Sequence, residues 1–195
     1  MRLVVGLGNP GERYAGTRHN VAWRVLDELA RRWRAKEVGA TPVYAVRQAD
    51  VAGDTVTLMQ PLTFMNNSGD AVDAWQHGAQ GPAADLLVVG DDVYLPVGTL
   101  RIRARGSSGG HRGLESIERV MGRQDFARLR IGVGVAASSA VLKEHVLAGF
   151  TPEERRRIDE TVMKAADAVE CWVAEGVLAA MNRFNRRTGK EVREP

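Results

Sequence analysis

The chain has 195 residues, of which 44% are hydrophobic, so it is long and apolar enough to fold around one core. Its single cysteine excludes an internal disulfide framework, and four dispersed histidines with one thiol show no metal-ligand spacing. The first residues lack a signal-peptide pattern, and no apolar run approaches the roughly 18 residues that span a bilayer. We therefore expect a cytoplasmic protein with neither a structural metal nor a membrane partner.

The first half of the chain alternates between strand and helix patterns. In chain order it predicts a strand at 2–7, a helix from near 19 to 33, strands at 43–51 and 55–59, and a helix at 66–77. The two middle strands are separated by Ala52-Gly53-Asp54, which is typical of a hairpin turn. An antiparallel hairpin is therefore expected within an otherwise alternating pattern.

The second half continues the alternation and ends in a long helix. It predicts a buried strand at 86–89, an alternating strand at 99–103, a helix at 114–121, a strand at 129–135 and a helix after Thr151. Thr151 precedes Pro152, as an N-cap precedes proline at the first helical position. Met163, Cys171 and Trp172 fall on the apolar stripe of this helix, where core packing is expected.

Strands interleaved with helices favour a single-domain α/β sandwich. We expect a central mixed, mainly parallel twisted sheet flanked by helices, with the hairpin supplying antiparallel strands. No repeat or linker divides the chain, so residues 1–184 form the expected catalytic domain and the polar residues 185–195 a charged C-terminal tail.

Positive charge gathers in the second half of the chain. The net charge of +3 divides into −2 for residues 1–100 and +5 for residues 101–195. Eight arginines lie between residues 101 and 130, so this stretch is either a phosphate-binding region or a solvated face. The glycine-serine loop at 106–110 lies among them, and it suits either a lid or a phosphate nest.

Three glycines near the N-terminus, Gly6, Gly8 and Gly11, have the spacing G-x-G-x-x-G of a dinucleotide-binding turn. Pro10 removes a backbone donor from that turn, and no helical pattern starts directly after Gly11. A nicotinamide cofactor is therefore not expected.

Polar side chains follow several expected strands and suit ester hydrolysis. They are Asn9 after the first strand with His19 ten residues later, Asn66 after the hairpin, and Asp91 after the buried strand. A neutral imidazole can take a proton from water, a carboxylate can orient it, and asparagine amides can hold an oxyanion. Each residue also has a structural interpretation, as a turn, a helix start or a cap. No G-x-S-x-G elbow is present, so activated water is favoured over a protein nucleophile.

Six motifs occur in order along nearly the whole chain: "GLGNPGERYAGTRHN", "PLTFMNNSG", "GDDVYLPVG", "GGHRGL", "RLRIGVG" and "MNRFN". Together they make the chain resemble the bacterial peptidyl-tRNA hydrolases. The resemblance implies cleavage of the ester between a peptide and the 3′-terminal ribose of tRNA, which recycles tRNA from prematurely released peptidyl-tRNA. It implies no cofactor, and we expect a monomer.

The resemblance also implies roles for individual residues. His19 matches the general base of the family, and Asp91 matches the carboxylate that supports it. Asn9 matches a residue that helps to distinguish a substrate with a blocked N-terminus from one with a free amino acid. The remaining matched positions are Tyr14, Phe64 and Asn66 in the substrate site, and Arg103 and Arg130 at tRNA phosphate. Arg112 stands where the family commonly has asparagine, and a guanidinium lacks the acceptor oxygen of an amide.

Two other functions remain open on sequence alone. One is an RNA-binding protein that has kept the fold and lost catalysis, which the intact His19 and Asp91 argue against. The other is a dinucleotide-dependent oxidoreductase, which rests on glycine spacing alone.

Overall fold

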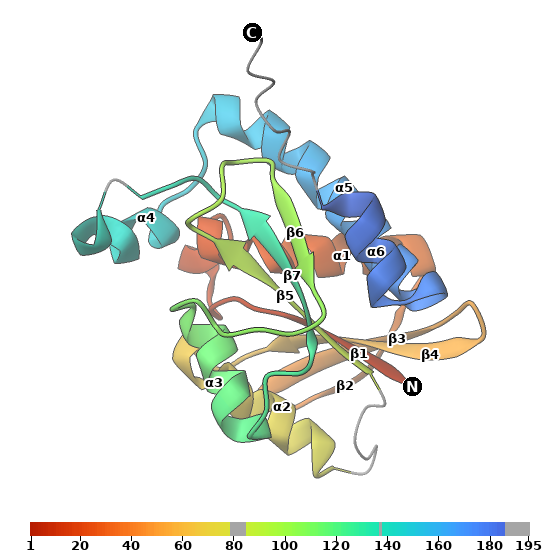
Figure 1. Ribbon diagram of the computed structural model, residues 1–195. Coiled ribbons are helices and arrows are strands. Elements are labelled where there is room, and N and C mark those ends of the chain that lie inside the picture. Colours follow the sequence, from red (N-terminus) through yellow and green to blue (C-terminus); the bar gives the residue numbers. More distant parts are fainter. Residues whose placement is uncertain (79–84, 137, 186–195) are drawn as a thin grey trace, which may run out of the picture.

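The computed structural model describes residues 1–78, 85–136 and 138–185 (Figure 1). A seven-stranded sheet has the order β2-β3-β4-β1-β5-β7-β6. Its strands are β1 (Arg2–Gly6), β2 (Lys36–Ala40), β3 (Tyr44–Val51), β4 (Asp54–Pro61), β5 (Asp85–Asp92), β6 (Leu100–Arg103) and β7 (Ala127–Gly132). The central strands β4, β1, β5 and β7 are parallel, whereas β2, β3 and β6 join through antiparallel pairs. The expected mixed, mainly parallel sheet is confirmed.

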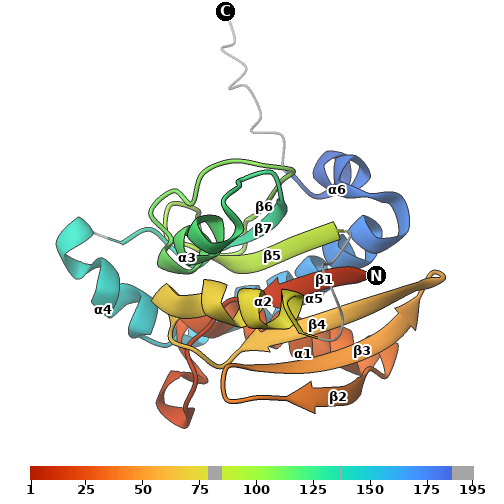
Figure 2. The same ribbon diagram turned by 90° about the horizontal axis from the view of Figure 1, so that it is seen from below.

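Helices cover both faces of the sheet (Figure 2). One group comprises α1 (Val21–Trp33), α5 (Pro152–Glu175) and α6 (Val177–Phe184), and the other comprises α2 (Ser68–Gln76) and α3 (Arg112–Met121). The short α4 (Leu142–Leu147) projects at one end of the sheet, and four single-turn helices are η1 (Glu12–Tyr14), η2 (Arg18–Asn20), η3 (Met65–Asn67) and η4 (Ser139–Val141). Within the described residues, no helix is long and apolar enough to cross a membrane.

The central strand β1 shows why two layers of helices are needed. Leu3, Val4 and Val5 are all fully buried. Successive side chains of a strand point to opposite faces, so Val4 packs in the core beneath α1 and α5, while Leu3 and Val5 pack in the core beneath α2 and α3. A continuous apolar run therefore marks a strand that is covered on both sides.

The glycine pair at the end of β1 serves helix packing. A Cβ atom on Gly6 would lie 2.7 Å from the Leu26 side chain, and one on Gly8 would lie 2.5 Å from the Trp23 ring. Trp23 Nε1 also donates a hydrogen bond to the Gly6 carbonyl at 3.0 Å. The glycines thus allow α1 to pack directly on the first strand, and the chain after Gly11 forms η1 rather than a phosphate-binding helix.

Local turn and cap signals in the sequence correspond to the structure. Ala52 and Gly53 have φ values of 51° and 85°, so they form a two-residue hairpin turn with both central residues left-handed. Thr151 and Glu154 form a reciprocal capping box at the start of α5, with Pro152 at the first position. The expected hairpin and the start of the long helix are confirmed.

Other expectations were incomplete or wrong. The sequence patterns did not predict β2, α4 or α6. The last strand covers Ala127–Gly132 instead of residues 129–135, and Gly134, with a φ of 95°, leaves the extended conformation of a strand. Met163 was expected in the core and is 42% exposed, since it lies on the solvent side of α5.

The C-terminal end of the described chain is tied to the sheet edge. The Asn185 side chain accepts from the Ile102 backbone N–H at 2.7 Å and donates to the Ile102 carbonyl at 3.0 Å. The first residue of the expected tail therefore contacts the domain, and the rest of that tail, residues 186–195, lies outside the described residues.

Candidate active site

A cavity of about 580 Å³ opens at the carboxyl ends of the parallel strands β1, β4 and β5. Ligand sites of open α/β sheets are typically found at this edge. Eight of the nine residues proposed from the sequence line the cavity: Asn9, Tyr14, His19, Phe64, Asn66, Asp91, Arg112 and Arg130. Arg103 lies outside it, on β6.

One carboxylate oxygen joins two histidines at the base of the cavity. His19 Nδ1 lies 2.7 Å from Asp91 Oδ1, and His111 Nε2 lies 2.9 Å from the same oxygen. His111 Nδ1 accepts hydrogen bonds from the backbone N–H groups of Gly113 and Leu114, so its proton is on Nε2 and is donated to Asp91.

The same logic assigns the proton of His19. Its Nδ1 faces an acceptor-only carboxylate, so Nδ1 carries the proton and Nε2 keeps its lone pair. No hydrogen bond occupies Nε2 within the described part of the chain. His19 lies in η2, directly before α1, and its side chain is 14% exposed on the cavity wall. The ring can therefore accept a proton from a molecule in the cavity.

Asp91 is held as an anion although its side chain is only 2% exposed. Burial by itself raises the pKa of this carboxyl, but attraction to His19 and His111 and their hydrogen bonds outweigh burial and hold its pKa well below the usual range. Asp91 therefore stays ionised and fixes the orientation of both rings.

His19, Asp91 and His111 are also close enough to one another to suggest a metal site, with potential ligand atoms all within 4.8 Å. A metal ligand must offer a lone pair. The Nε2 atom of His111 carries a proton and Nδ1 of His19 donates to Asp91, so the facing nitrogens have none to offer. The arrangement is that of a hydrogen-bonded acid-base group.

The amide of Asn9 is fixed by contacts on two sides. Its Oδ1 accepts from the Met65 backbone N–H at 2.8 Å, which leaves Nδ2 as a donor on the cavity side. Asn20 holds the backbone of Asn9 in turn, because its side chain accepts from the N–H and donates to the carbonyl, both at 2.9 Å. The structure thus presents a preorganised N–H donor near His19.

Two aromatic rings form another part of the cavity wall. Tyr14 and Phe64 meet edge to face with centroids 6.4 Å apart, and Phe64 is 52% exposed. Arg13 packs its guanidinium over the Tyr14 ring at 4.6 Å. Asn66 is exposed beside them, with Nδ2 donating to Asn67 Oδ1 at 3.1 Å. This wall offers apolar and amide contacts to a substrate.

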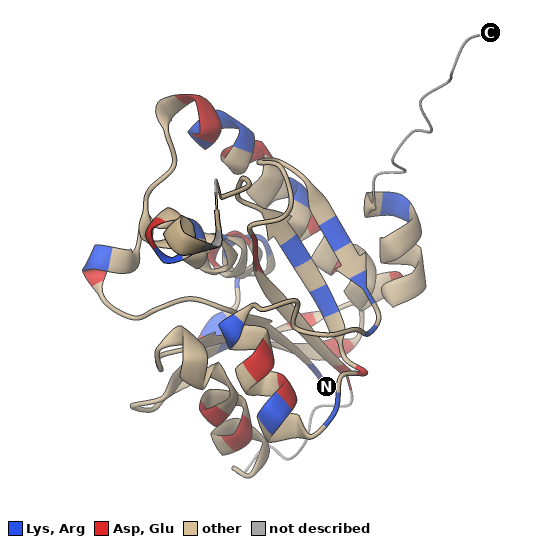
Figure 3. Cartoon of the chain, turned by 60° about the vertical axis from the view of Figure 1, so that its left-hand side comes forward, with Lys and Arg blue, Asp and Glu red and all other residues tan. Residues whose placement is uncertain are grey.

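Four arginines share one face of the β6–β7 pair, where Figure 3 shows basic bands on neighbouring strands. The register pairs Arg101 with Arg130 and Arg103 with Arg128, and directly opposed residues point to the same face. Arg101 and Arg103 are exposed. Arg128 is buried and bonds to Glu118 at 3.0 Å, so including it in a phosphate-binding surface was wrong.

Arg130 is partly buried and holds the loop that was expected to be a lid or a phosphate nest. Its guanidinium bonds to Asp92 Oδ2 at 3.2 Å and to the carbonyls of Ser107 and Ser108 at 3.0 and 2.7 Å. Arg128 also bonds to the carbonyls of Gly106 and Ser107. The 106–108 segment therefore turns carbonyl oxygens toward two arginines of β7.

Sequence reasoning assigned no role to several residues of the cavity. His111 was part of a quoted motif, and only its contact with Asp91 reveals its importance. Asn20 was noticed beside His19, but its clamp on Asn9 depends on the folded loops. The wall formed by Leu142, Lys143, Val146 and Leu147 comes from α4, whose six residues are too short for a clear periodic signal.

Comparisons with known proteins find relatives along nearly the whole chain. The model of the family described as "Peptidyl-tRNA hydrolase" matches residues 3–192. The chain is 44% identical to a peptidyl-tRNA hydrolase of Roseiflexus castenholzii, with 100% of this chain and 95% of that protein covered. It is 45% identical to the one of Chloroflexus aggregans, with 95% and 99% covered.

Solved structures show the same relationship. The peptidyl-tRNA hydrolase of Acinetobacter baumannii is 32% identical and superposes with a TM-score of 0.88, covering 95% of this chain and 94% of that one. A methylthioadenosine nucleosidase of Campylobacter jejuni superposes with a TM-score of 0.55, covering 89% of this chain and 98% of that one. Its sequence is only 9% identical, so this likeness shows a shared fold and nothing more. The agreement in sequence along nearly the whole length, together with the shared structure, places this chain in the peptidyl-tRNA hydrolase family.

Proposed function

We propose that this peptidyl-tRNA hydrolase cleaves the ester between an N-blocked peptide and the 3′ end of tRNA with a water molecule activated by His19. The enzyme recycles tRNA from prematurely released peptidyl-tRNA. The observation that carries the mechanism is the 2.7 Å contact between His19 Nδ1 and Asp91, which leaves Nε2 free on the wall of the cavity.

The proton transfers follow from this geometry. His19 Nε2 removes a proton from water as the water oxygen attacks the ester carbonyl, and Asp91 stabilises the imidazolium that forms. When the tetrahedral intermediate collapses, the bond to the ribose oxygen breaks and that oxygen takes the proton back from Nε2. The products are a peptide carboxylate and a tRNA with a free terminal hydroxyl.

Asn9 supplies the electrostatic part of the mechanism. The intermediate carries an oxyanion, and a fixed neutral donor stabilises it without the reorganisation that water requires. Asn9 Nδ2 suits this task because Met65 and Asn20 hold the residue from both sides. The same donor can contact the blocked N-terminal amide of a short substrate, which would help to discriminate against free amino acids.

We assign the remaining site residues to substrate binding. Tyr14, Phe64 and Asn66 line the cavity and suit the peptide and the terminal nucleotide. The positive residues Arg103, Arg112 and Arg130 suit tRNA phosphates, since the planar guanidinium matches phosphate geometry. Arg130 carries this charge and also donates hydrogen bonds to carbonyls of the 106–108 loop.

We further propose a cytoplasmic monomer of domain 1–184, with a tail at 185–195, that needs neither metal nor nicotinamide. The protonated facing nitrogens of the histidine pair argue against a metal, and the nine residues between Gly11 and the start of α1 argue against a dinucleotide turn. The cytoplasm is where the substrate is produced.

The test is release of an N-blocked aminoacyl group from tRNA in the presence of a chelator. Wild type should cleave the blocked substrate and spare the unblocked one. The His19→Ala variant should lose roughly 10²- to 10⁴-fold in kcat while its affinity for tRNA stays nearly unchanged. Equal losses of kcat and affinity would contradict the assigned role, and binding without cleavage by wild type would favour the RNA-binding alternative.

A further inference from the structure

Tyr94 is an exposed aromatic residue on the rim of the active-site cavity. It lies in the connection between β5 and β6, lines the cavity and is 65% exposed. Neither another aromatic ring nor a cation stacks on its side chain among the described residues. A large, mostly exposed planar side chain thus stands on the wall of the site, where a ligand can contact it.

The backbone under Tyr94 is held firmly, although the side chain is free. The Tyr94 N–H donates to Asp92 Oδ1 at 2.8 Å, and Asp92 Oδ2 receives Arg130 at 3.2 Å. The next residue, Leu95, is buried, and its carbonyl accepts from the Gly134 N–H at 3.1 Å. These contacts fix the backbone and leave the phenol ring free, so the ring is carried on a rigid support.

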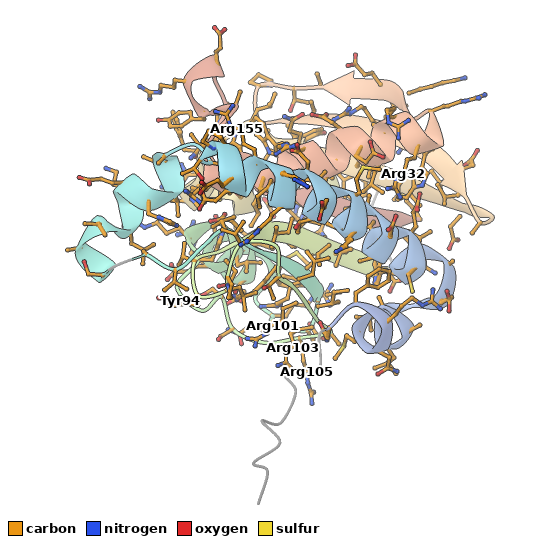
Figure 4. All side chains as sticks on the ribbon, turned by 90° about the horizontal axis from the view of Figure 1, so that it is seen from above. Arg32, Tyr94, Arg101, Arg103, Arg105 and Arg155 are labelled. Atoms are coloured by element: carbon orange, nitrogen blue, oxygen red, sulfur yellow. The ribbon has the colours of Figure 1, made fainter. Side chains whose placement is uncertain are left out.

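Tyr94 is near Asp91 in the chain and lies on the same side of the molecule as a row of exposed arginines. Tyr94 is three positions after Asp91, a span of at most about 11 Å for an extended chain. Figure 4 places Tyr94 on the same side of the molecule as Arg101, Arg103 and Arg105, which follow one another along β6 and the segment after it. All three arginines are exposed, and no ion pair ties them within the described part of the chain.

We propose that Tyr94 is the stacking platform for the terminal nucleobase of the substrate. This inference rests on the proposed function, because the base is attached to the ribose that carries the ester beside His19. Sites for single-stranded nucleic acid combine aromatic side chains that stack bases with positive charges that follow the backbone. Tyr94 and the β6 arginines provide these two parts in continuous order.

The charge distribution favours a nucleobase over a peptide side chain at this position. A row of cations leads away from Tyr94 along β6, and a polyanionic strand needs such a row, whereas peptides of varied sequence do not. The aromatic pair Tyr14 and Phe64 is a separate wall of the same cavity and remains available to the peptide.

A fluorescent base tests the stacking directly. A deacylated tRNA with 2-aminopurine in place of the terminal adenine should be quenched when it binds wild type or Tyr94→Phe, which keeps the ring. Tyr94→Leu, which is apolar without a π face, should abolish most of the quenching. Leu178→Ala is the matched control, because Leu178 is 69% exposed on α6 and does not line the cavity.

Kinetics provide the second measurement. Tyr94→Leu should raise KM for the blocked aminoacyl-tRNA about 5- to 100-fold with kcat nearly unchanged, and Tyr94→Phe should stay close to wild type. With a terminal nucleotide that lacks its base, the KM values of wild type and Tyr94→Leu should be equal.

Three outcomes would overturn the inference. These are quenching that survives in Tyr94→Leu, a Tyr94→Phe variant as impaired as Tyr94→Leu, or a KM change that depends on the peptide and not on the base. Wild-type turnover in the same assays tests the proposed function separately. Failure of the stacking role of Tyr94 can therefore be distinguished from failure of the hydrolase function.

Discussion

His19 Nδ1 lies 2.7 Å from Oδ1 of Asp91, although 72 positions separate the two residues in the chain. The contact forms because β1 and β5 are neighbouring parallel strands whose carboxyl ends meet at one edge. Asp91 is the seventh residue of β5, and η2 brings His19 back to that edge after the loop that follows β1. The acid-base group therefore depends on the parallel sheet.

The first prediction concerns Asp91→Asn. An amide of similar size can donate to Nδ1 of His19, which shifts the ring proton to Nε2 and removes the base. In the Ser-His-Asp triad the equivalent change lowers kcat by roughly 10⁴-fold, so we expect a fall of roughly 10³- to 10⁴-fold in single-turnover hydrolysis. Because the pKa of Asp91 lies well below the usual range, the carboxylate is present in wild type at all ordinary pH values. A variant whose single-turnover rate lies within tenfold of the wild-type rate would contradict the assignment.

The second prediction concerns the partly buried ion pair between Arg18 and Glu154. Arg18 bonds to both oxygens of Glu154 at 3.0 and 2.7 Å, and it also donates to the Val133 carbonyl. The hydrogen bond from Arg18 is the main cause that lowers the pKa of Glu154. Ionised Glu154 therefore stabilises the fold above its unfolded pKa, near 4.3, and this contribution is lost as the pH falls through the folded pKa.

Glu154→Gln should accordingly lower the free energy of unfolding by about 1–3 kcal/mol near pH 7. Glutamine can keep the capping box with Thr151, so the change isolates the ion pair. In urea titrations, the difference from wild type should shrink below about pH 4. Glu160→Gln, at an exposed position of the same helix, is the control and should change little. A difference independent of pH would show that charge is not its cause.

The third prediction separates tRNA contacts from general charge effects. Arg103→Ala should weaken tRNA binding and reduce the magnitude of the slope of log affinity against log salt by about 0.7 to 0.9, the value for one phosphate. Lys36→Ala removes the same charge from β2, at the opposite edge of the sheet, and should leave the slope unchanged. Similar effects of both variants would mean that Arg103 acts only through net charge.

The fourth prediction concerns Arg112, the first residue of α3, which is exposed on the cavity wall. No hydrogen bond or ion pair holds its guanidinium within the described part of the chain. If it binds a phosphate near the ester, Arg112→Asn should raise KM and leave kcat unchanged. It should also reduce the magnitude of the slope of log affinity against log salt by about 0.7 to 0.9, the value for one phosphate. Arg112→Lys should restore the slope, because lysine keeps the charge. A large fall in kcat with an unchanged slope would instead place Arg112 among the groups that act on the reacting ester.

Elements with strong local signals could be predicted from the sequence. Thr151, Pro152 and Glu154 specify a helix start through contacts within four residues. The apolar run in β5 and the alternating β6 differ in burial as their patterns predicted. Weak signals failed: β2 is fully exposed at the sheet edge, so no burial pattern marks its residues.

The candidate site was predictable as a set of residues but not as an arrangement. Motif resemblance named His19, Asp91 and Asn9, and the order of strands and helices indicated that they meet at one edge. The tautomer of His19 and the orientation of the Asn9 amide follow only from their partners, Asp91 and Met65, which lie far away in sequence.

By itself, the sequence determined the family, the α/β architecture, the capped final helix and the alternation that puts Arg101 and Arg103 on one face of β6. Those properties depend on nearest neighbours along the chain or on motifs. Only the tertiary structure decided which arginines face solvent, because Glu118 on α3 and the 106–107 carbonyls bury Arg128. It also decided that Asp91 serves two histidines, since charge, hydrogen bonding and burial at that carboxylate come from segments that meet only when the sheet forms.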